Sequence, residues 1–256
     1  MPPIEVERRG AVLRLAINRP EKKNALTAAM YHALADAFEQ AEADAAVRVV
    51  LLHGSGDAFS AGNDLEDFLR IPWKGEEMPP PARFIRAVAS ATKPVVAAVH
   101  GLAVGVGTTI LLHCDLVYAA EDARLLMPFV NLGLVPEAGS TLLLPELIGQ
   151  RRAAELLLLA SPFTAQRAYE LGIVNQVLAP HEVVPAAEQA ARILAERPAN
   201  AIRRSKQMMK EHLKADLDRV IREEVQAIAT MLDSPESREA LSAFVEKRKP
   251  DFSKFR

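Results

Sequence analysis

The longest uncharged apolar run of the chain covers residues 95–112. It reaches the length at which a membrane-spanning helix must be considered, since such a helix needs about 20 apolar residues. Gly101, Gly105 and Gly107 interrupt the stretch, its first part is rich in β-branched residues, and its last part favours a helix. The stretch therefore predicts a buried strand, a turn and the start of a helix, and no membrane span.

Short apolar runs of the same kind recur through the first half of the chain. The predicted strands cover residues 12–17, 49–52, 94–99 and 116–118. After the first of them, Thr27 is a suitable N-cap for an amphipathic helix that ends near Asp44. This alternation predicts an α/β fold around a parallel sheet with both faces covered, in which ligands bind at the ends of strands.

The sequence becomes helical after about residue 150. One helix is predicted around residues 217–232, where an apolar stripe has helical spacing and Glu223 and Glu224 are placed largely off that stripe. Another is predicted for residues 234–247. These apolar faces must pack on the sheet domain, on a partner subunit or on both. We therefore divide the chain into a core domain of residues 1–195 and a C-terminal helical region of residues 196–256.

Composition indicates an ordinary globular protein and narrows its partners. The chain has 256 residues, is 50% hydrophobic and carries a formal net charge of -2, so no nucleic-acid partner is predicted. Its one cysteine, Cys114, excludes an intrachain disulfide, and the histidines show no ligand spacing, so no metal site is predicted. The amino-terminal sequence lacks the regions of a signal peptide and the C-terminal residues differ from a peroxisomal address, so we expect a cytoplasmic, bacterial protein.

Two turns of small residues follow predicted strands and are candidates for a binding site. They cover residues 58–65 and 99–107, and helical sequence follows each of them. Such turns can leave backbone N–H groups unpaired and directed at one point, and small residues let a substrate approach the backbone closely. Taken singly, each turn is explained more simply by a tight reversal of the chain.

Taken together, these segments resemble the crotonase, or enoyl-CoA hydratase/isomerase, superfamily over nearly the whole chain. The motifs that carry the likeness are residues 18–20 with 24–26, 59–65, 98–107 with 114–115, 132–136, 197–198 and 243–248. Their order makes the likeness much more specific than any single glycine pattern. The resemblance implies a crotonase-like spiral of ββα units, a C-terminal region that mediates trimerisation, and a homotrimer or a dimer of trimers. It also implies an acyl-CoA substrate, with no cofactor besides the CoA that the substrate carries.

The resemblance further implies which residues form the site. Backbone N–H groups of Ala61 and Val106 would form an oxyanion hole for the thioester enolate; family members commonly have glycine at the position of Val106, but the donor is main chain. The residues expected to bind the acyl-CoA are Lys22, Lys23, Ala25, Ala61, Asp64 and Leu65. Arg19 and Arg83 are further candidates for the CoA phosphates, and residues 70–83 are expected to cover the acyl pocket.

One position separates the possible reactions. Hydratases of this superfamily use two glutamates, whose positions fall here on Thr109 and Phe129, and neither residue can act as a general base. Glu137 instead occupies the position at which peroxisomal-type Δ3,Δ2-enoyl-CoA isomerases place their catalytic glutamate. We expect Glu137 to move a proton from C2 to C4 of a 3-enoyl-CoA, with its pKa raised by apolar neighbours such as Phe129 and Leu132.

Other interpretations stay open at this stage. A glutamate after a proline is also a common start of a helix, so Glu137 alone does not prove catalysis. Hydration of a 2-enoyl-CoA, another crotonase-type reaction, or acyl-CoA binding without turnover would each use the same two turns.

Overall fold

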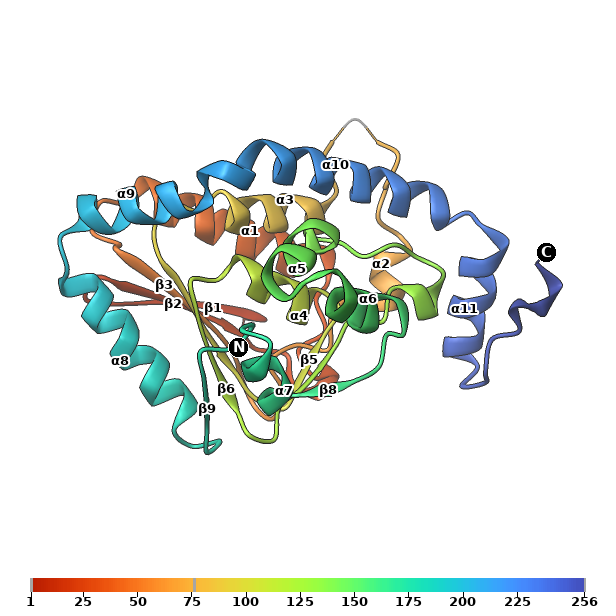
Figure 1. The fold of residues 1–256 in the computed structure, drawn as a ribbon, viewed down its shortest axis with the longest axis horizontal. Coiled ribbons are helices and arrows are strands. Elements are labelled where there is room, and N and C mark those ends of the chain that lie inside the picture. Colours follow the sequence, from red (N-terminus) through yellow and green to blue (C-terminus); the bar gives the residue numbers. More distant parts are fainter. Residues whose placement is uncertain (1, 76, 256) are drawn as a thin grey trace.

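The computed structural model describes residues 2–75 and 77–255, which form two β-sheets surrounded by helices (Figure 1). Met1, Arg256 and Glu76, the last within the segment expected to cover the acyl pocket, lie outside the described residues. In the part of the chain that is described, no helix is both long and apolar enough to cross a bilayer. The stretch 95–112 forms two strands and two short helices, as predicted except for the second strand.

The larger sheet has six strands in the order β1-β2-β3-β4-β6-β9. Its strands are β1 (Ile4–Arg9), β2 (Val12–Ile17), β3 (Val49–Gly54), β4 (Val95–Val99), β6 (Leu116–Ala120) and β9 (Gln176–Leu178). All neighbours are parallel except β1 and β2, which form an antiparallel hairpin. Leu15, Leu52, Ala97 and Val117 lie in one register across four strands and are buried, as expected for a sheet covered on both faces.

The smaller sheet consists of three short strands, β5 (Leu102–Val104), β7 (Arg124–Leu126) and β8 (Phe163–Thr164). The chain passes from β4 to β5 and from β6 to β7, so consecutive strands alternate between the two sheets before a helix follows. This alternation produces the predicted ββα repeats. The short strands escaped prediction because two or three residues are too few to show a period of two.

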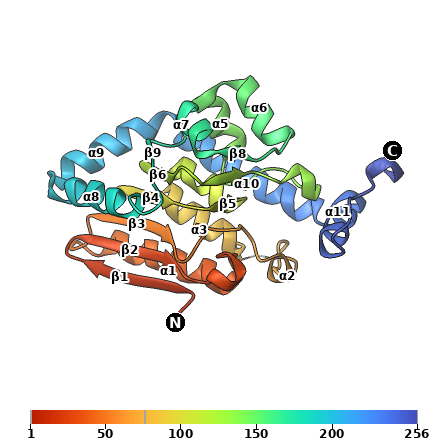
Figure 2. The same ribbon diagram turned by 90° about the horizontal axis from the view of Figure 1, so that it is seen from below.

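Helices cover the larger sheet and continue into the C-terminal part of the chain. α8 packs on β3, β4 and β6, whereas α1 packs on α3 and on the first two strands (Figure 2). The helices are α1 (Ala28–Ala43), α2 (Leu65–Phe68), α3 (Pro80–Ala89), α4 (Val106–Thr109), α5 (Ser140–Ile148), α6 (Gln150–Leu158), α7 (Ala165–Glu170), α8 (Val183–Glu196), α9 (Ala199–Lys210), α10 (Lys214–Met231) and α11 (Pro235–Val245). Thr27 caps α1, as predicted, by accepting a hydrogen bond from the N–H of Met30.

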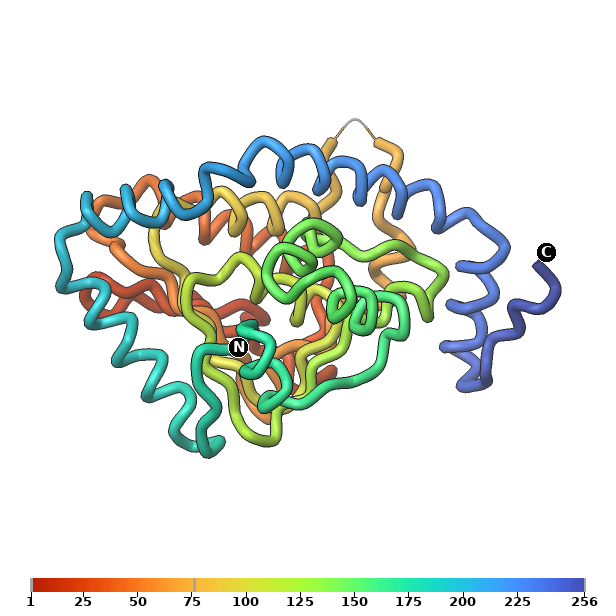
Figure 3. The backbone as a smooth tube through the Cα atoms, viewed as in Figure 1, coloured from red at the N-terminus to blue at the C-terminus, as the bar shows by residue number. Residues whose placement is uncertain are grey.

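The last helices cross the core and then leave it. α10 packs against α5, and α11 contacts the 3-10 helix η3 (Val130–Leu132) at the edge of the molecule (Figure 3). The apolar stripe of α10 includes the buried Ile221 and Ile228, as predicted. Glu224 is also buried, so its predicted place off the stripe is wrong. The reason is its spacing, three residues after Ile221 and four before Ile228, which is the same helix face.

Asn24 joins the loop after β2 to the turn after β3. It is fully buried and has a left-handed φ of 59°, a conformation that asparagine tolerates better than most residues. Its Oδ1 accepts a hydrogen bond from the N–H of Arg19 at 2.8 Å, and its Nδ2 donates to the carbonyls of Ser55 at 2.9 Å and Ala58 at 2.6 Å. Asn24 thus fixes the segment that leads into the first small-residue turn.

Replacing Asn24 by alanine is expected to lower the free energy of unfolding by about 2–4 kcal/mol, because buried carbonyl groups lose their donor. Urea unfolding followed by circular dichroism measures this change. Asn200→Ala, at an exposed position of α9, is the matched control and should change stability by less than about 0.5 kcal/mol. Equal stabilities of the two variants would contradict this role for Asn24.

Candidate active site

A cavity of about 730 Å³ lies where the two small-residue turns meet α10 and α11. Its wall includes Ala61, Gly62 and Asn63 from the first turn, Val104 and Gly105 from the second, and Glu137. Apolar side chains such as Phe68, Phe129 and Leu132 make up much of the rest. A mainly apolar cavity with a few polar groups is typical of a small-molecule site.

The two turns lie directly against each other. The N–H of Ser60 donates to the carbonyl of Leu102, and the N–H of Val104 donates to that of Ser60, each at 2.9 Å. Gly62 has a φ of 86°, and a Cβ there would lie 2.7 Å from the carbonyl oxygen of Val104. A Cβ on Gly107 would likewise lie 2.8 Å from that of Ser60. These two glycines are required because any side chain would force the turns apart.

The structure corrects the predicted donor on the first turn. The N–H of Ala61 donates to the carbonyl of Lys23 at 2.8 Å, so it cannot serve an oxyanion. The N–H of Gly62 donates to Oγ of Ser60 at 3.1 Å. The next N–H, that of Asn63, has no acceptor among the described residues, and Asn63 lines the cavity. The first-turn donor is therefore expected two residues beyond the predicted one.

The predicted donor on the second turn keeps its position. Val106 is the first residue of α4, where the N–H groups have no partner within the helix. Its N–H also finds no acceptor elsewhere in the described chain. Residues 60–62 pack against residues 103–107. The unpaired N–H groups of Asn63 and Val106 therefore both lie where the two turns come together.

The side chain of Asn63 is fixed by a hydrogen bond from Tyr31 of α1. The Tyr31 hydroxyl donates to Oδ1 of Asn63 at 2.5 Å. Tyr31 is almost fully buried, and burial together with the nearby Glu137 raises the pKa of its hydroxyl well above the ordinary value. Tyr31 therefore stays neutral and acts as a hydrogen-bond donor; nothing in the spacing of α1 distinguished it from a core residue.

Glu137 is the only carboxylate among the described residues that line the cavity. Its side chain is 3% exposed, and Oε1 has no hydrogen-bond partner among those residues. Burial raises the pKa of Glu137 to about 8, and the charge of Glu224 adds to that effect. Phe129 and Leu132, the predicted apolar neighbours, line the same cavity.

The positions of the two hydratase glutamates carry no acid–base group. Thr109 is fully buried, does not line the cavity, and donates from Oγ1 to the carbonyl of Gly105 at 3.3 Å. Phe129 does line the cavity and presents an apolar ring to it. Among the described residues, the lining of the cavity therefore contains one carboxylate in place of a pair.

Some of the residues expected to bind the acyl-CoA line the cavity and the others lie outside its wall. Ala61 and Leu65 line the cavity, while Lys22 and Lys23 lie exposed in and after the 3-10 helix η1 (Pro20–Lys22). Asp64 caps α2 and accepts from Arg19 at 2.7 Å, and the carbonyl of Ala25 accepts from the same guanidinium at 3.0 Å. These contacts order the segment before the first turn.

Two further expectations about the pocket are not met. Arg83 pairs with Asp36 and Glu39 of α1, so the structure does not bring it to the cavity. The described part of residues 70–83 does not line the cavity either. Trp73 packs its ring on Phe68, with ring centroids 4.9 Å apart, and only Phe68 reaches the wall.

Comparisons with known proteins identify the family to which the chain belongs. The family model described as enoyl-CoA hydratase/isomerase matches residues 7–255. The 1,2-epoxyphenylacetyl-CoA isomerase of Escherichia coli is 36% identical, with 94% of this chain and 95% of the relative covered. The crotonyl-CoA hydratase of Syntrophomonas wolfei is 34% identical, with 97% and 96% covered.

A solved structure extends the likeness to three dimensions. An enoyl-CoA hydratase/isomerase from Pseudoalteromonas atlantica superposes with a TM-score of 0.92 at 40% identity, over 98% of this chain and 99% of that one. This agreement confirms the predicted crotonase-like α/β fold with its C-terminal helical region. The chain therefore belongs to the enoyl-CoA hydratase/isomerase family of the crotonase superfamily.

Proposed function

We propose that this protein is an isomerase that moves the double bond of a 3-enoyl-CoA to give a 2-enoyl-CoA. The observation that carries the proposal is the single buried carboxylate of Glu137, with one oxygen unpartnered, in a cavity bounded by the two turns. A carboxylate with a raised pKa is suited to accept a proton and to return it near neutral pH.

The proposed reaction needs one base and two hydrogen-bond donors. Ionised Glu137 removes a proton from C2, and the electron pair moves through the thioester carbonyl to give a dienolate. The N–H groups of Asn63 and Val106 stabilise the charge on the thioester oxygen. Glu137 then delivers the proton to C4, the double bond settles between C2 and C3, and no cofactor besides the substrate's CoA is consumed.

Hydration is the main competing reaction, because one of the relatives is named a hydratase. Addition of water to a 2-enoyl-CoA requires a positioned water and two acid–base groups in this superfamily. The cavity offers one carboxylate and the ring of Phe129 where the second glutamate would lie. This arrangement favours proton transfer within the acyl chain over addition of water.

The handling of CoA and the assembly state are part of the same proposal. Lys22 and Lys23, exposed beside the first turn, are suited to the CoA phosphates. Exposed apolar side chains on the C-terminal helices, including Met208, Met209 and Phe244, support assembly into a homotrimer or a dimer of trimers. We further propose that the enzyme works in the cytoplasm on acyl-CoA esters of fatty-acid or related metabolism.

Glu137→Gln is expected to lower kcat for 3-enoyl-CoA isomerisation by about 10²–10⁴-fold, the usual contribution of a general acid–base group. Conversion is followed by chromatography of the CoA esters, with 2-enoyl-CoA and 3-hydroxyacyl-CoA tested in parallel. Glu146→Gln, at an exposed position of α5, removes the same charge outside the cavity and should leave kcat unchanged. Rapid hydration of 2-enoyl-CoA by the wild type, or tight binding of acyl-CoA without turnover, would contradict the isomerase proposal.

The pH dependence of kcat/KM is expected to rise to a plateau with an apparent pKa of about 8, because only ionised Glu137 can accept the proton and burial raises its pKa to about 8. Below that pKa the carboxyl is protonated and the rate falls. Steady-state rates measured at pH values on both sides of this pKa give the rising part of the kcat/KM profile. A profile that is flat through pH 8, or that declines as the pH rises, is incompatible with Glu137 as the base.

Val106→Pro is expected to lower kcat by about 10²–10³-fold, since proline removes one backbone donor of the oxyanion hole. Proline is tolerated at the first position of a helix, which Val106 occupies in α4. Val106→Ala keeps the N–H and should retain kcat near that of the wild type. Circular dichroism checks that both variants fold, and a folded Val106→Pro enzyme of full activity would remove Val106 from the oxyanion hole.

A further inference from the structure

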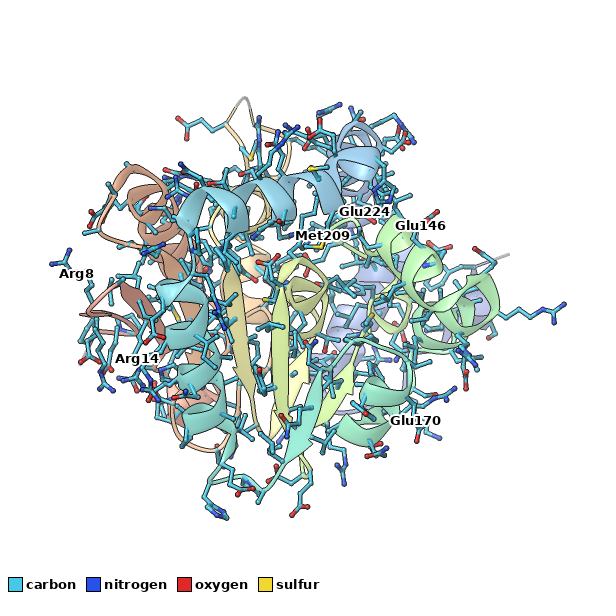
Figure 4. The ribbon with its side chains drawn as sticks, turned by 60° about the vertical axis from the view of Figure 1, so that its left-hand side comes forward. Arg8, Arg14, Glu146, Glu170, Met209 and Glu224 are labelled. Carbon is cyan, nitrogen blue, oxygen red and sulfur yellow. The ribbon has the colours of Figure 1, made fainter. Side chains whose placement is uncertain are left out.

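The turn that carries Glu137 is held from the C-terminal helical region by Glu224 of α10. One carboxylate oxygen of Glu224 accepts the N–H of Gly139 at 2.6 Å. The other accepts the N–H and the hydroxyl of Thr141, at 3.2 Å and 2.6 Å. Figure 4 shows Glu224 where α10 passes the segment that begins α5. Glu224 therefore caps the start of α5 directly after the proposed base.

This contact is unusual for its position in a helix. Glu224 is 5% exposed and lies on the face of α10 that also buries Ile221 and Ile228. A carboxylate is costly to bury and persists there only where donors compensate for lost water. All its recorded hydrogen bonds go to the two residues Gly139 and Thr141. The donors that compensate for burying the Glu224 carboxylate therefore all come from the turn after Glu137.

The turn itself needs such support. Ala138 has a φ of 62°, a left-handed conformation that costs an alanine about 1–2 kcal/mol. On its other side, Nε2 of His113 lies 2.7 Å from the carbonyl of Ala138. Burial lowers the pKa of His113 to about 4, so the ring is neutral and donates this hydrogen bond. Glu224 and His113 hold the turn from two elements far apart in the sequence.

We propose that Glu224 is a positioning residue for Glu137, which fixes the turn that aims the base into the cavity and places a second carboxylate behind it. This inference rests on the proposed role of Glu137 as the base. Burial raises the pKa of Glu224 to about 7, so it is charged when the enzyme works above that pH. Its charge in turn raises the pKa of Glu137.

The other titratable groups around Glu137 do not reproduce this effect. Tyr31 from α1 and His113 before β6 are both neutral near pH 7, because burial raises the pKa of the first and lowers that of the second to about 4. Arg248 and Lys249 line the cavity on its α11 side and are cations, so they would favour ionisation of Glu137. Among the described residues, Glu224 is the acid whose charge opposes ionisation of Glu137.

The test compares Glu224→Gln and Glu224→Ala with Glu223→Gln, an exposed neighbour on the same helix that loses the same charge. Three properties are measured on the full-length protein: kcat and KM for 3-enoyl-CoA, the pH profile of kcat/KM, and amide hydrogen exchange of the segment 137–141. Glu224→Gln keeps the size of the side chain and serves if Glu224→Ala does not fold.

The expected result separates positioning from a general loss of structure. Glu224→Ala should speed amide exchange in the segment 137–141 and lower kcat by about 10²-fold at a little-changed KM, the effect of a misplaced catalytic group. Glu224→Gln should move the apparent pKa of the kcat/KM limb below that of the wild type. Glu223→Gln should match the wild type in all three measurements.

Either of two results would overturn the inference if the enzyme isomerises 3-enoyl-CoA. Wild-type kcat and an unchanged pH profile in folded Glu224→Gln would limit Glu224 to a structural cap, as would faster exchange without any change in kcat. If the wild type does not isomerise 3-enoyl-CoA, the proposed function fails. The inference is then decided by amide exchange and by a double-mutant cycle: the stabilisation that Glu137→Gln gives above pH 7 should be smaller in the Glu224→Gln background. An equal stabilisation in both backgrounds would overturn it.

Discussion

The close packing of two strand-end turns determines everything else about this site. Ser60 exchanges backbone hydrogen bonds with Leu102 and Val104, and the two turns approach so closely that only glycine fits at positions 62 and 107. This contact joins the two sheets, because one turn follows β3 and the other includes β5. It also leaves the N–H groups of Asn63 and Val106 without acceptors in the described chain. The same geometry that builds the fold thus creates the electrostatic feature on which the proposed chemistry depends.

The second constraint is the burial of charge. Glu137 sits in an apolar wall and Glu224 lies behind it, so two acids share a region that water barely reaches. The pKa of each carboxyl rises because its ionised form is poorly solvated, and the charge of Glu224 further disfavours ionisation of Glu137. A base prepared in this way binds protons more readily than an exposed carboxylate does. The C-terminal helices therefore take part in the electrostatics of the site as well as in its shape.

The sequence predicted β2, β3, β4, β6, α1, α10 and the crotonase-like fold, because long periodic segments and ordered motifs are strong signals. It missed β5, β7, β8 and β9, which are too short to show a period, and also the six-residue strand β1. The first-turn donor was misplaced by two residues, since a string of small residues does not reveal which N–H is already paired with Lys23. Glu224 was placed largely off the apolar stripe because its charge was given more weight than its spacing from Ile221 and Ile228.

The central claim is that one carboxylate carries a proton from C2 to C4. The most direct measurement uses 3-enoyl-CoA deuterated at C2 and follows the label in the 2-enoyl-CoA product by mass spectrometry and NMR. If Glu137 carries the proton in a cavity closed to bulk water, part of the deuterium appears at C4, and the transfer is lost in Glu137→Gln. Loss of the abstracted deuterium entirely to solvent, or its transfer to C4 equally well in Glu137→Gln, would contradict the account.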